Sequence, residues 1–220
     1  MQAVRARVER AAAACGRPAA DVQLLAVSKT FPAAYIEDAY AAGQSLFGES
    51  YVQEAVKKIT QLSRLPVEWH FVGPIQSNKT TAIATHFSWL HSLSRDKIAE
   101  RLDAARPSDL PPLNVCIQVN VSGEASKSGV TPGQERALAE RIACLPRLRL
   151  RGLMAIPEPS PDAALQARRF ELLRTLNEGL ARDGHAVDTL SMGMSDDFEA
   201  AIAHGATVVR VGTAIFGRRP

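Results

Sequence analysis

The sequence predicts a single closed (β/α)8 barrel of the TIM type, within the α/β class. Eight apolar runs with strand character alternate with segments of helical periodicity along the 220 residues. Parallel neighbouring strands need crossover helices, and closure of the sheet removes its exposed edges. No linker or internal repeat divides the sequence, so we expect one domain over residues 1–220. An open doubly wound sheet is the competing fold.

An amphipathic helix opens the chain, and alternating strands and helices follow it. Pro32 suits the first turn of a helix that Gly43 stops, and Pro66 ends the next helix. The strand runs are rich in apolar, aromatic and β-branched residues. In this half, strands are expected at residues 22–28, 45–48, 68–72 and 89–92, and helices at residues 2–14, 32–42, 52–65, 79–86 and 96–106.

The second half continues the same alternation. Strands are expected at residues 113–121, 148–154, 189–191 and 207–211, and helices at residues 132–145, 162–183 and 196–204. A polar connection of small residues covers residues 122–129. The sequence ends soon after the eighth strand. We therefore expect the last helix to be missing or very short, and the extra N-terminal helix to cover that seam.

Composition narrows the class of function. Lysine and arginine number 26 against 23 aspartates and glutamates, and this charge of +3 is dispersed, which argues against a nucleic-acid surface. Cys15, Cys116 and Cys144 follow no metal-ligand spacing and suit a reducing compartment. The first residues resemble neither a signal peptide nor a membrane span. We expect a cytoplasmic protein without a metal or membrane partner.

Lys29 ends the first predicted strand. Side chains alternate along a strand, so Leu25, Val27 and Lys29 share one face. Low dielectric beside two apolar residues would disfavour the ammonium and lower its pKa, which favours attack on a carbonyl and formation of a Schiff base. The alternative is a lysine that extends from the strand end into water.

The loops after strands seven and eight suggest an anion site. In barrels, chemistry gathers at the carboxyl ends of the strands, and phosphate often binds at these two loops. Ser191 ends strand seven, and Ser195 could cap the next helix. After strand eight, Gly212 permits close backbone approach and Thr213 offers a hydroxyl. An ordinary helix cap and an ordinary glycine turn are the alternative reading.

Arg210 shares a strand face with Val208 and needs a hydrogen-bond partner among apolar neighbours. The partner is either a carboxylate from the helix layer or an acceptor on a ligand. A lysine, an arginine and a phosphate loop at one barrel end match the requirements of pyridoxal 5'-phosphate (PLP). These are an aldehyde trap, a partner for the ring nitrogen and an anion cradle.

Several motifs, in order along nearly the whole chain, resemble the pyridoxal phosphate homeostasis protein family. They are LLAVSKT at residues 24–30, FGE at 47–49, HFVG at 70–73, QSNK at 76–79, KSG at 127–129, GLM at 152–154, SMGMSD at 191–196 and RVGTAIFG at 210–217. The resemblance implies a barrel like the amino-terminal domain of alanine racemase, with no C-terminal racemase domain. It further implies PLP bound as an internal aldimine.

By the same resemblance, Lys29 carries the cofactor, Arg210 faces the pyridine nitrogen, and the loops of strands seven and eight hold the phosphate. The family usually has asparagine near the ring where this chain has Ser50, so cofactor affinity is the property that this difference affects. The candidate cofactor-binding residues are Lys29, Ser50, His70, Met154, Ser191, Ser195, Arg210, Gly212 and Thr213. No catalytic residue is predicted.

Other polar and sulfur-containing residues have a second interpretation. His70 lies on the strand face of Glu68 and is either near the ring or a hydrogen-bonded barrel histidine. Lys79 and Lys127 follow strands three and five; they either attract the phosphate or are solvated surface lysines. Met154, together with Met192 and Met194, is also suited to packing.

The leading functional hypothesis is a monomeric carrier that binds PLP and buffers its supply with little or no catalysis, with PLP-dependent apoenzymes as candidate recipients. An amino-acid racemase is the alternative, but it needs an acid/base on each face of the substrate. A barrel enzyme that acts on a phosphorylated metabolite through a Lys29 Schiff base is the third. An arginine beside the ring nitrogen stays protonated and cannot readily donate a proton, which discourages carbanion chemistry.

Overall fold

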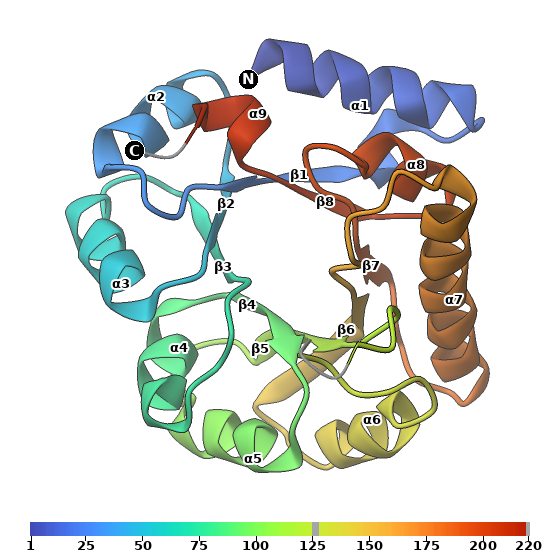
Figure 1. Ribbon diagram of the computed structural model, residues 1–220. Coiled ribbons are helices and arrows are strands. Elements are labelled where there is room, and N and C mark those ends of the chain that lie inside the picture. The colour runs from blue at the N-terminus through green and yellow to red at the C-terminus, as the bar shows by residue number, and fades with distance from the viewer. Residues whose placement is uncertain (125–127, 219–220) are drawn as a thin grey trace.

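The computed structural model describes residues 1–124 and 128–218, and its centre is a closed barrel of eight parallel strands in chain order (Figure 1). The strands are β1 (Gln23–Val27), β2 (Leu46–Glu49), β3 (Glu68–Phe71), β4 (Trp89–Leu93), β5 (Leu113–Gln118), β6 (Leu148–Met154), β7 (Thr189–Ser191) and β8 (Val208–Val211). The predicted (β/α)8 architecture is confirmed, and the open doubly wound sheet is wrong.

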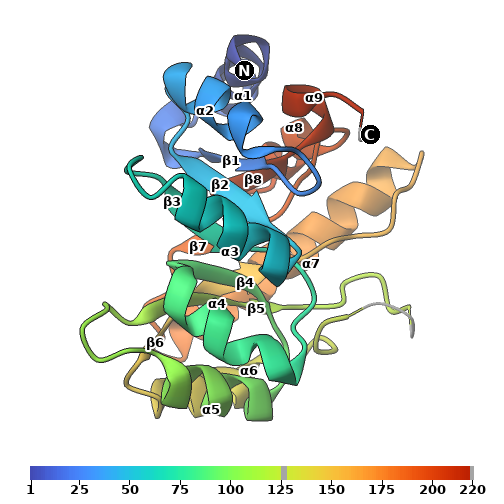
Figure 2. The same ribbon diagram turned by 90° about the vertical axis from the view of Figure 1, so that its left-hand side faces the viewer.

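Helices form a layer around the strands, as the side view in Figure 2 also shows. They are α1 (Gln2–Ala14), α2 (Ala33–Ala41), α3 (Val52–Gln61), α4 (Thr80–His86), α5 (Asp96–Ala105), α6 (Glu135–Ala143), α7 (Ala163–Arg182), α8 (Phe198–Ala203) and α9 (Thr213–Phe216), with the short 3-10 turns η1 (Ala19–Asp21) and η2 (Ser77–Lys79). None of the helices in the described ranges is long and apolar enough to cross a membrane.

Successive side chains of each strand face alternately the interior of the barrel and the surrounding helices. The register places Leu25 of β1 beside Arg210 of β8. A Cβ on Gly48 would lie 3.3 Å from Val27 and 3.4 Å from Leu25, so these three positions face the barrel interior. The intervening positions face the helices and form one large apolar core with them, which includes Ala26, Phe47, Phe71, Leu90, Ile117, Leu153 and Val209. This core fixes the strand register and therefore the height of each inward side chain.

The opening helix covers the seam between the first and last strands, as expected. α1 lies alongside α8, where Arg7 Nε donates to Glu199 Oε1 at 2.7 Å and the guanidinium stacks 4.5 Å from the Phe198 ring centroid. α9 is a single turn after β8, so the predicted short last helix is confirmed.

Some local expectations are wrong: α3 ends at Gln61 and β5 at Gln118, both earlier than expected, and the start of α8 also differs. The helix expected from residue 196 begins at Phe198, and Asp197 occupies the N-cap position. The Met194 amide donates to Asp197 Oδ1 at 2.6 Å. Ser195 therefore lies ahead of the cap, in the loop that follows β7, and its hydroxyl is not the cap of α8.

Candidate functional site

A cavity of about 210 Å³ lies at the carboxyl end of the barrel. It is lined by Val27, Lys29, Ser50, Val72, Ile156, Met194, Ser195, Asp196, Arg210, Gly212 and Thr213. These residues come from the ends of β1, β2, β3 and β8 and from the loops after β6 and β7. A larger hollow of about 550 Å³ beside α5 and α6 contains no residue of a barrel strand. The smaller cavity includes Val27 of β1 and Arg210 of β8 in its lining, so the interior of the barrel opens into it.

Six of the nine candidate residues line this cavity together: Lys29, Ser50, Ser195, Arg210, Gly212 and Thr213. Residues from opposite ends of the chain meet there because β8 pairs directly with β1. A Cβ on Gly212 would lie 3.1 Å from the Val27 carbonyl oxygen, so the two strand ends approach more closely than a larger residue would comfortably allow. The amine of Lys29 and the hydroxyl of Thr213 thus border one space.

Arg210 is a buried cation at the floor of the cavity. Its Nη1 donates to the Ser191 carbonyl at 2.6 Å and to the Ser191 hydroxyl at 2.8 Å, and its Nη2 donates to the Ala155 carbonyl at 2.8 Å. Burial lowers the pKa of Arg210 to about 10, and the charge of Asp197 opposes that shift. The guanidinium remains protonated at neutral pH, with neutral oxygens as its immediate partners.

A chain of hydrogen bonds continues from Arg210 through the barrel interior. The Ser191 hydroxyl lies 2.8 Å from His91 Nδ1, and His91 Nε2 lies 2.9 Å from His70 Nδ1. His70 Nε2 lies 2.9 Å from Glu68 Oε1. We call the residues Glu68, His70, His91 and Ser191 the interior chain. It joins three strands, β3, β4 and β7, and ends on a carboxylate whose side chain is 43% exposed.

The partners of the interior chain determine its direction. The hydrogen bond from His70 lowers the pKa of Glu68, so this carboxylate accepts. Burial lowers the pKa of both His70 and His91, and the charges of His70 and Arg210 add to the shift at His91. With both rings neutral, His70 donates from Nε2 and accepts at Nδ1, and His91 does the same. The Ser191 hydroxyl then donates to His91 while it accepts from Arg210.

Three candidate residues lie below the cavity and do not line it. His70 and Ser191 belong to the interior chain, and Met154 packs with Trp89 and Cys116 in a small apolar cluster inside the barrel. The hydrogen-bonded barrel histidine is therefore the interpretation of His70 that this geometry favours. Direct contact of these three side chains with a cofactor stays a prediction.

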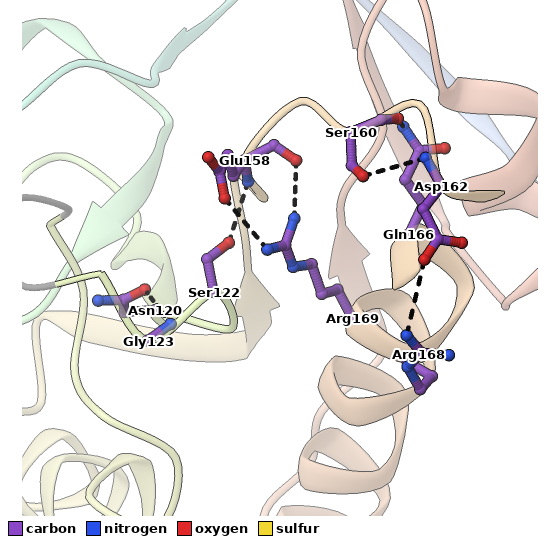
Figure 3. Close-up of polar contacts among 9 residues, drawn as sticks. All are labelled: Asn120, Ser122, Gly123, Glu158, Ser160, Asp162, Gln166, Arg168 and Arg169. Carbon is purple, nitrogen blue, oxygen red and sulfur yellow. Dashed lines mark hydrogen bonds and ion pairs between the residues drawn. The ribbon is translucent and has the colours of Figure 1, made fainter. Parts of the chain in front are cut away.

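The loops after β5 and β6 are fastened to each other and to α7 (Figure 3). The Glu158 amide donates to Ser122 Oγ at 3.0 Å, and Arg169 Nη1 donates to the Glu158 carbonyl at 2.9 Å. Asp162 caps α7 by accepting from the amides of Ala164 and Leu165. These contacts hold the segment that carries the cavity residue Ile156.

Two additional lysines, Lys79 and Lys127, are candidates for phosphate binding because they follow strands three and five. Lys79 ends η2 and does not line the cavity of Lys29. Lys127 lies outside the described residues. A role for either lysine in phosphate binding stays a prediction.

Comparison with known proteins identifies the family. The family model described as "Alanine racemase, N-terminal domain" matches residues 1–220. The pyridoxal phosphate homeostasis protein of Pseudomonas aeruginosa is 61% identical over 220 residues, which cover 98% of this chain and 93% of the relative. The corresponding protein of Escherichia coli K12 is 53% identical over 222 residues, with 98% and 94% covered.

Solved structures agree with this assignment. PipY of Synechococcus elongatus, solved with PLP bound, is 40% identical with a TM-score of 0.84, covering 96% of this chain and 100% of that chain. Alanine racemase of Corynebacterium glutamicum is 18% identical with a TM-score of 0.72, covering 100% of this chain and 61% of that chain, and it shows the shared fold alone. This chain therefore belongs to the pyridoxal phosphate homeostasis protein family, within the family of alanine racemase N-terminal domains.

Proposed function

We propose that the protein binds PLP reversibly in the Lys29 cavity and serves intracellular PLP homeostasis as a carrier or buffer. The observation that carries this proposal is the meeting of an amine, a buried guanidinium and a glycine–hydroxyl loop in one cavity. The PLP-bound structure of the relative PipY and the name shared by the curated relatives support it.

The residues present fit the chemical groups of PLP. Lys29 supplies the amine for the aldehyde, and the buried Arg210 guanidinium suits the ring nitrogen. Ser195 and Thr213 supply hydroxyls for the phosphate, and the first amides of α9 have no acceptor within that helix. Gly212 keeps the loop close to β1. When bound, the cofactor supplies an aldehyde and an electron-accepting ring.

The cavity favours retention over catalysis. Arg210 stays protonated and is held by carbonyl and hydroxyl oxygens, so it is a poor proton donor to a ring nitrogen. None of the three tyrosines lines the cavity; all of them lie in the described part of the chain. A racemase needs a second base opposite the lysine, and no tyrosine of this cavity fills that role.

The proposal extends to location and partners. The protein acts in the cytoplasm as a monomer, takes PLP as its ligand and passes it to PLP-dependent apoenzymes. Nucleic acid is not a partner, because the charge of +3 is dispersed along the sequence. A free aldehyde reacts with amines indiscriminately, so a reversible covalent store limits that damage while keeping the cofactor available.

Transfer and racemisation distinguish carrier from enzyme. PLP-loaded protein, freed of excess cofactor, is mixed with aspartate aminotransferase apoenzyme, and the recovered transaminase activity is followed. In parallel, L-alanine is incubated with the loaded protein and analysed by chiral chromatography. We expect reactivation of the apoenzyme and no D-alanine beyond that produced by free PLP. Absence of reactivation would contradict the carrier function, and D-alanine above the control would favour the racemase.

A further inference from the structure

A charged cluster lies behind Lys29, on the outer side of the barrel wall. Lys58 of α3 is 5% exposed. Its Nζ donates to the Ser28 carbonyl at 2.9 Å, to Glu49 Oε1 at 2.8 Å and to Glu54 Oε1 at 2.5 Å. One ammonium therefore connects the residue before Lys29 with two carboxylates from different elements.

The residue after Lys29 is fixed by the same cluster. The Thr30 amide donates to Glu54 Oε1 at 2.7 Å. Thr30 has φ of 70°, the one positive value at a residue other than glycine in the described ranges. This conformation is unfavourable for a β-branched residue and persists where neighbouring contacts hold it. It turns the chain sharply just after Lys29.

The residue before Lys29 is held twice. Ser28 is fully buried, and its hydroxyl donates to Glu49 Oε1 at 2.6 Å. Its carbonyl accepts the bond from Lys58 described above. The peptide units on both sides of Lys29 are thus attached to Lys58 and Glu54 of α3, and the Ser28 hydroxyl is attached to Glu49 of β2. The Lys29 side chain itself lines the cavity on the opposite side of the wall.

Stability alone gives little reason for this arrangement. Taking charges out of water is costly, and well-packed apolar residues often replace a buried ion pair without loss of stability. The cluster does constrain the backbone around Lys29, because each of its polar contacts with the end of β1 involves a residue adjacent to Lys29. Small displacements of a reacting group lower reaction rates strongly.

We propose that Glu54 and Lys58 are positioning residues for Lys29, which hold Ser28 and Thr30 so that the amine is directed at the aldehyde carbon of a bound ligand. This inference rests on the proposed PLP function. In the step concerned, a bond forms between Lys29 Nζ and the aldehyde carbon. The aldehyde oxygen leaves as water with two protons from the amine, and no oxidant or reductant takes part.

Two ligands separate positioning from binding. PLP can react with Lys29, whereas pyridoxine 5'-phosphate carries an alcohol in place of the aldehyde and can only bind. The variant Glu54→Ala removes the acceptor for the Thr30 amide, and Glu54→Gln keeps an oxygen there. Glu100→Gln removes a carboxylate on α5 that pairs with Arg141 at 2.6 Å and is the matched control. Far-ultraviolet circular dichroism establishes that each variant is folded.

We expect Glu54→Ala to slow the reaction of PLP with Lys29, followed by stopped-flow absorption, by between about 10-fold and about 100-fold. Its affinity for pyridoxine 5'-phosphate, measured by calorimetry, should stay within about 2-fold of wild type. The reason is that the change in binding free energy at the cavity should be smaller than the contribution of one hydrogen bond. Glu54→Gln should recover most of the rate, and Glu100→Gln should retain all of it.

Three results would overturn the inference. A wild-type reaction rate in Glu54→Ala would show that the cluster does not direct Lys29. An equal loss of PLP reaction and pyridoxine 5'-phosphate affinity would reduce the cluster to a general structural role. A wild-type protein that binds pyridoxine 5'-phosphate but never reacts with PLP, or that binds neither ligand, would overturn the proposed function as well.

Discussion

The two buried histidines of the interior chain make stability dependent on pH. His70 and His91 are 1% and 0% exposed, and burial lowers the pKa of both below the ordinary value. A histidine with a lowered pKa in the folded state contributes stability that is present above its unfolded pKa and is lost as pH falls. The unfolded chain binds protons near pH 6.5 that the folded barrel does not accept.

The size of the effect follows from this linkage. If both rings remain neutral in the folded state, each lowers the free energy of unfolding by about 1.4 kcal/mol between about pH 7.5 and about pH 5.5, or about 2.7 kcal/mol together. The substitution His91→Gln removes one of the two titrating rings. We expect the difference between the two pH values to fall by about half, to about 1.4 kcal/mol, whatever the variant loses at neutral pH.

Urea unfolding, followed by far-ultraviolet circular dichroism at both pH values, measures this difference. His86→Gln is the control, since His86 lies on α4 and makes none of the hydrogen bonds of the interior chain. A wild-type protein of equal stability at both pH values would refute the assignment of neutral rings. So would a His91→Gln variant that retains the whole wild-type difference.

One chemical modification and two substitutions test other parts of the structure. Burial raises the pKa of Cys116 to about 12, so we expect a thiol reagent to modify the exposed Cys15 and Cys144 in the native protein and all three cysteines only in denaturant. Modification of Cys116 in the native state would contradict its burial. In Gly73→Ala the new Cβ would lie 2.2 Å from the Ser50 carbonyl oxygen. We expect this substitution to lower the free energy of unfolding in urea by roughly 1–3 kcal/mol and to weaken PLP binding. Unchanged stability would be inconsistent with this packing. Ser50→Asn adds an amide at the cavity, and one additional hydrogen bond should tighten PLP binding about 2-fold to about 10-fold by calorimetry, whereas weaker binding would count against a contact there.

Strand alternation was sufficient to predict how the central cavity residues lie. Lys29 and Arg210 each share a strand face with inward apolar residues, and closure of the barrel brings the first and last strands together. The glycine and hydroxyl of the β8 loop followed from the general location of phosphate sites in such barrels. These features depend on local sequence and on topology alone.

The interior chain could not be predicted in the same way. Alternation places His91 on the same face as Trp89, which indicates an inward side chain, but its partner Ser191 is 100 residues away in sequence. That contact depends on the relative heights of β4 and β7. The prediction of the α8 cap failed for a different reason. Asp197 occupies the N-cap position and also accepts from the Met194 amide. Serine and aspartate are about equally favourable at an N-cap, so the sequence alone does not distinguish Ser195 from Asp197.

The most direct test of the account is chemical trapping of PLP on the purified protein. Borohydride reduction after addition of PLP, followed by peptide mass spectrometry, locates the modified lysine, and Lys29→Ala and Lys79→Ala are treated in parallel. We expect the added mass on the peptide that contains Lys29 in wild type and in Lys79→Ala, and its loss in Lys29→Ala. A wild-type protein modified elsewhere, or a Lys29→Ala variant that traps PLP as wild type does, would contradict the assignment of this cavity.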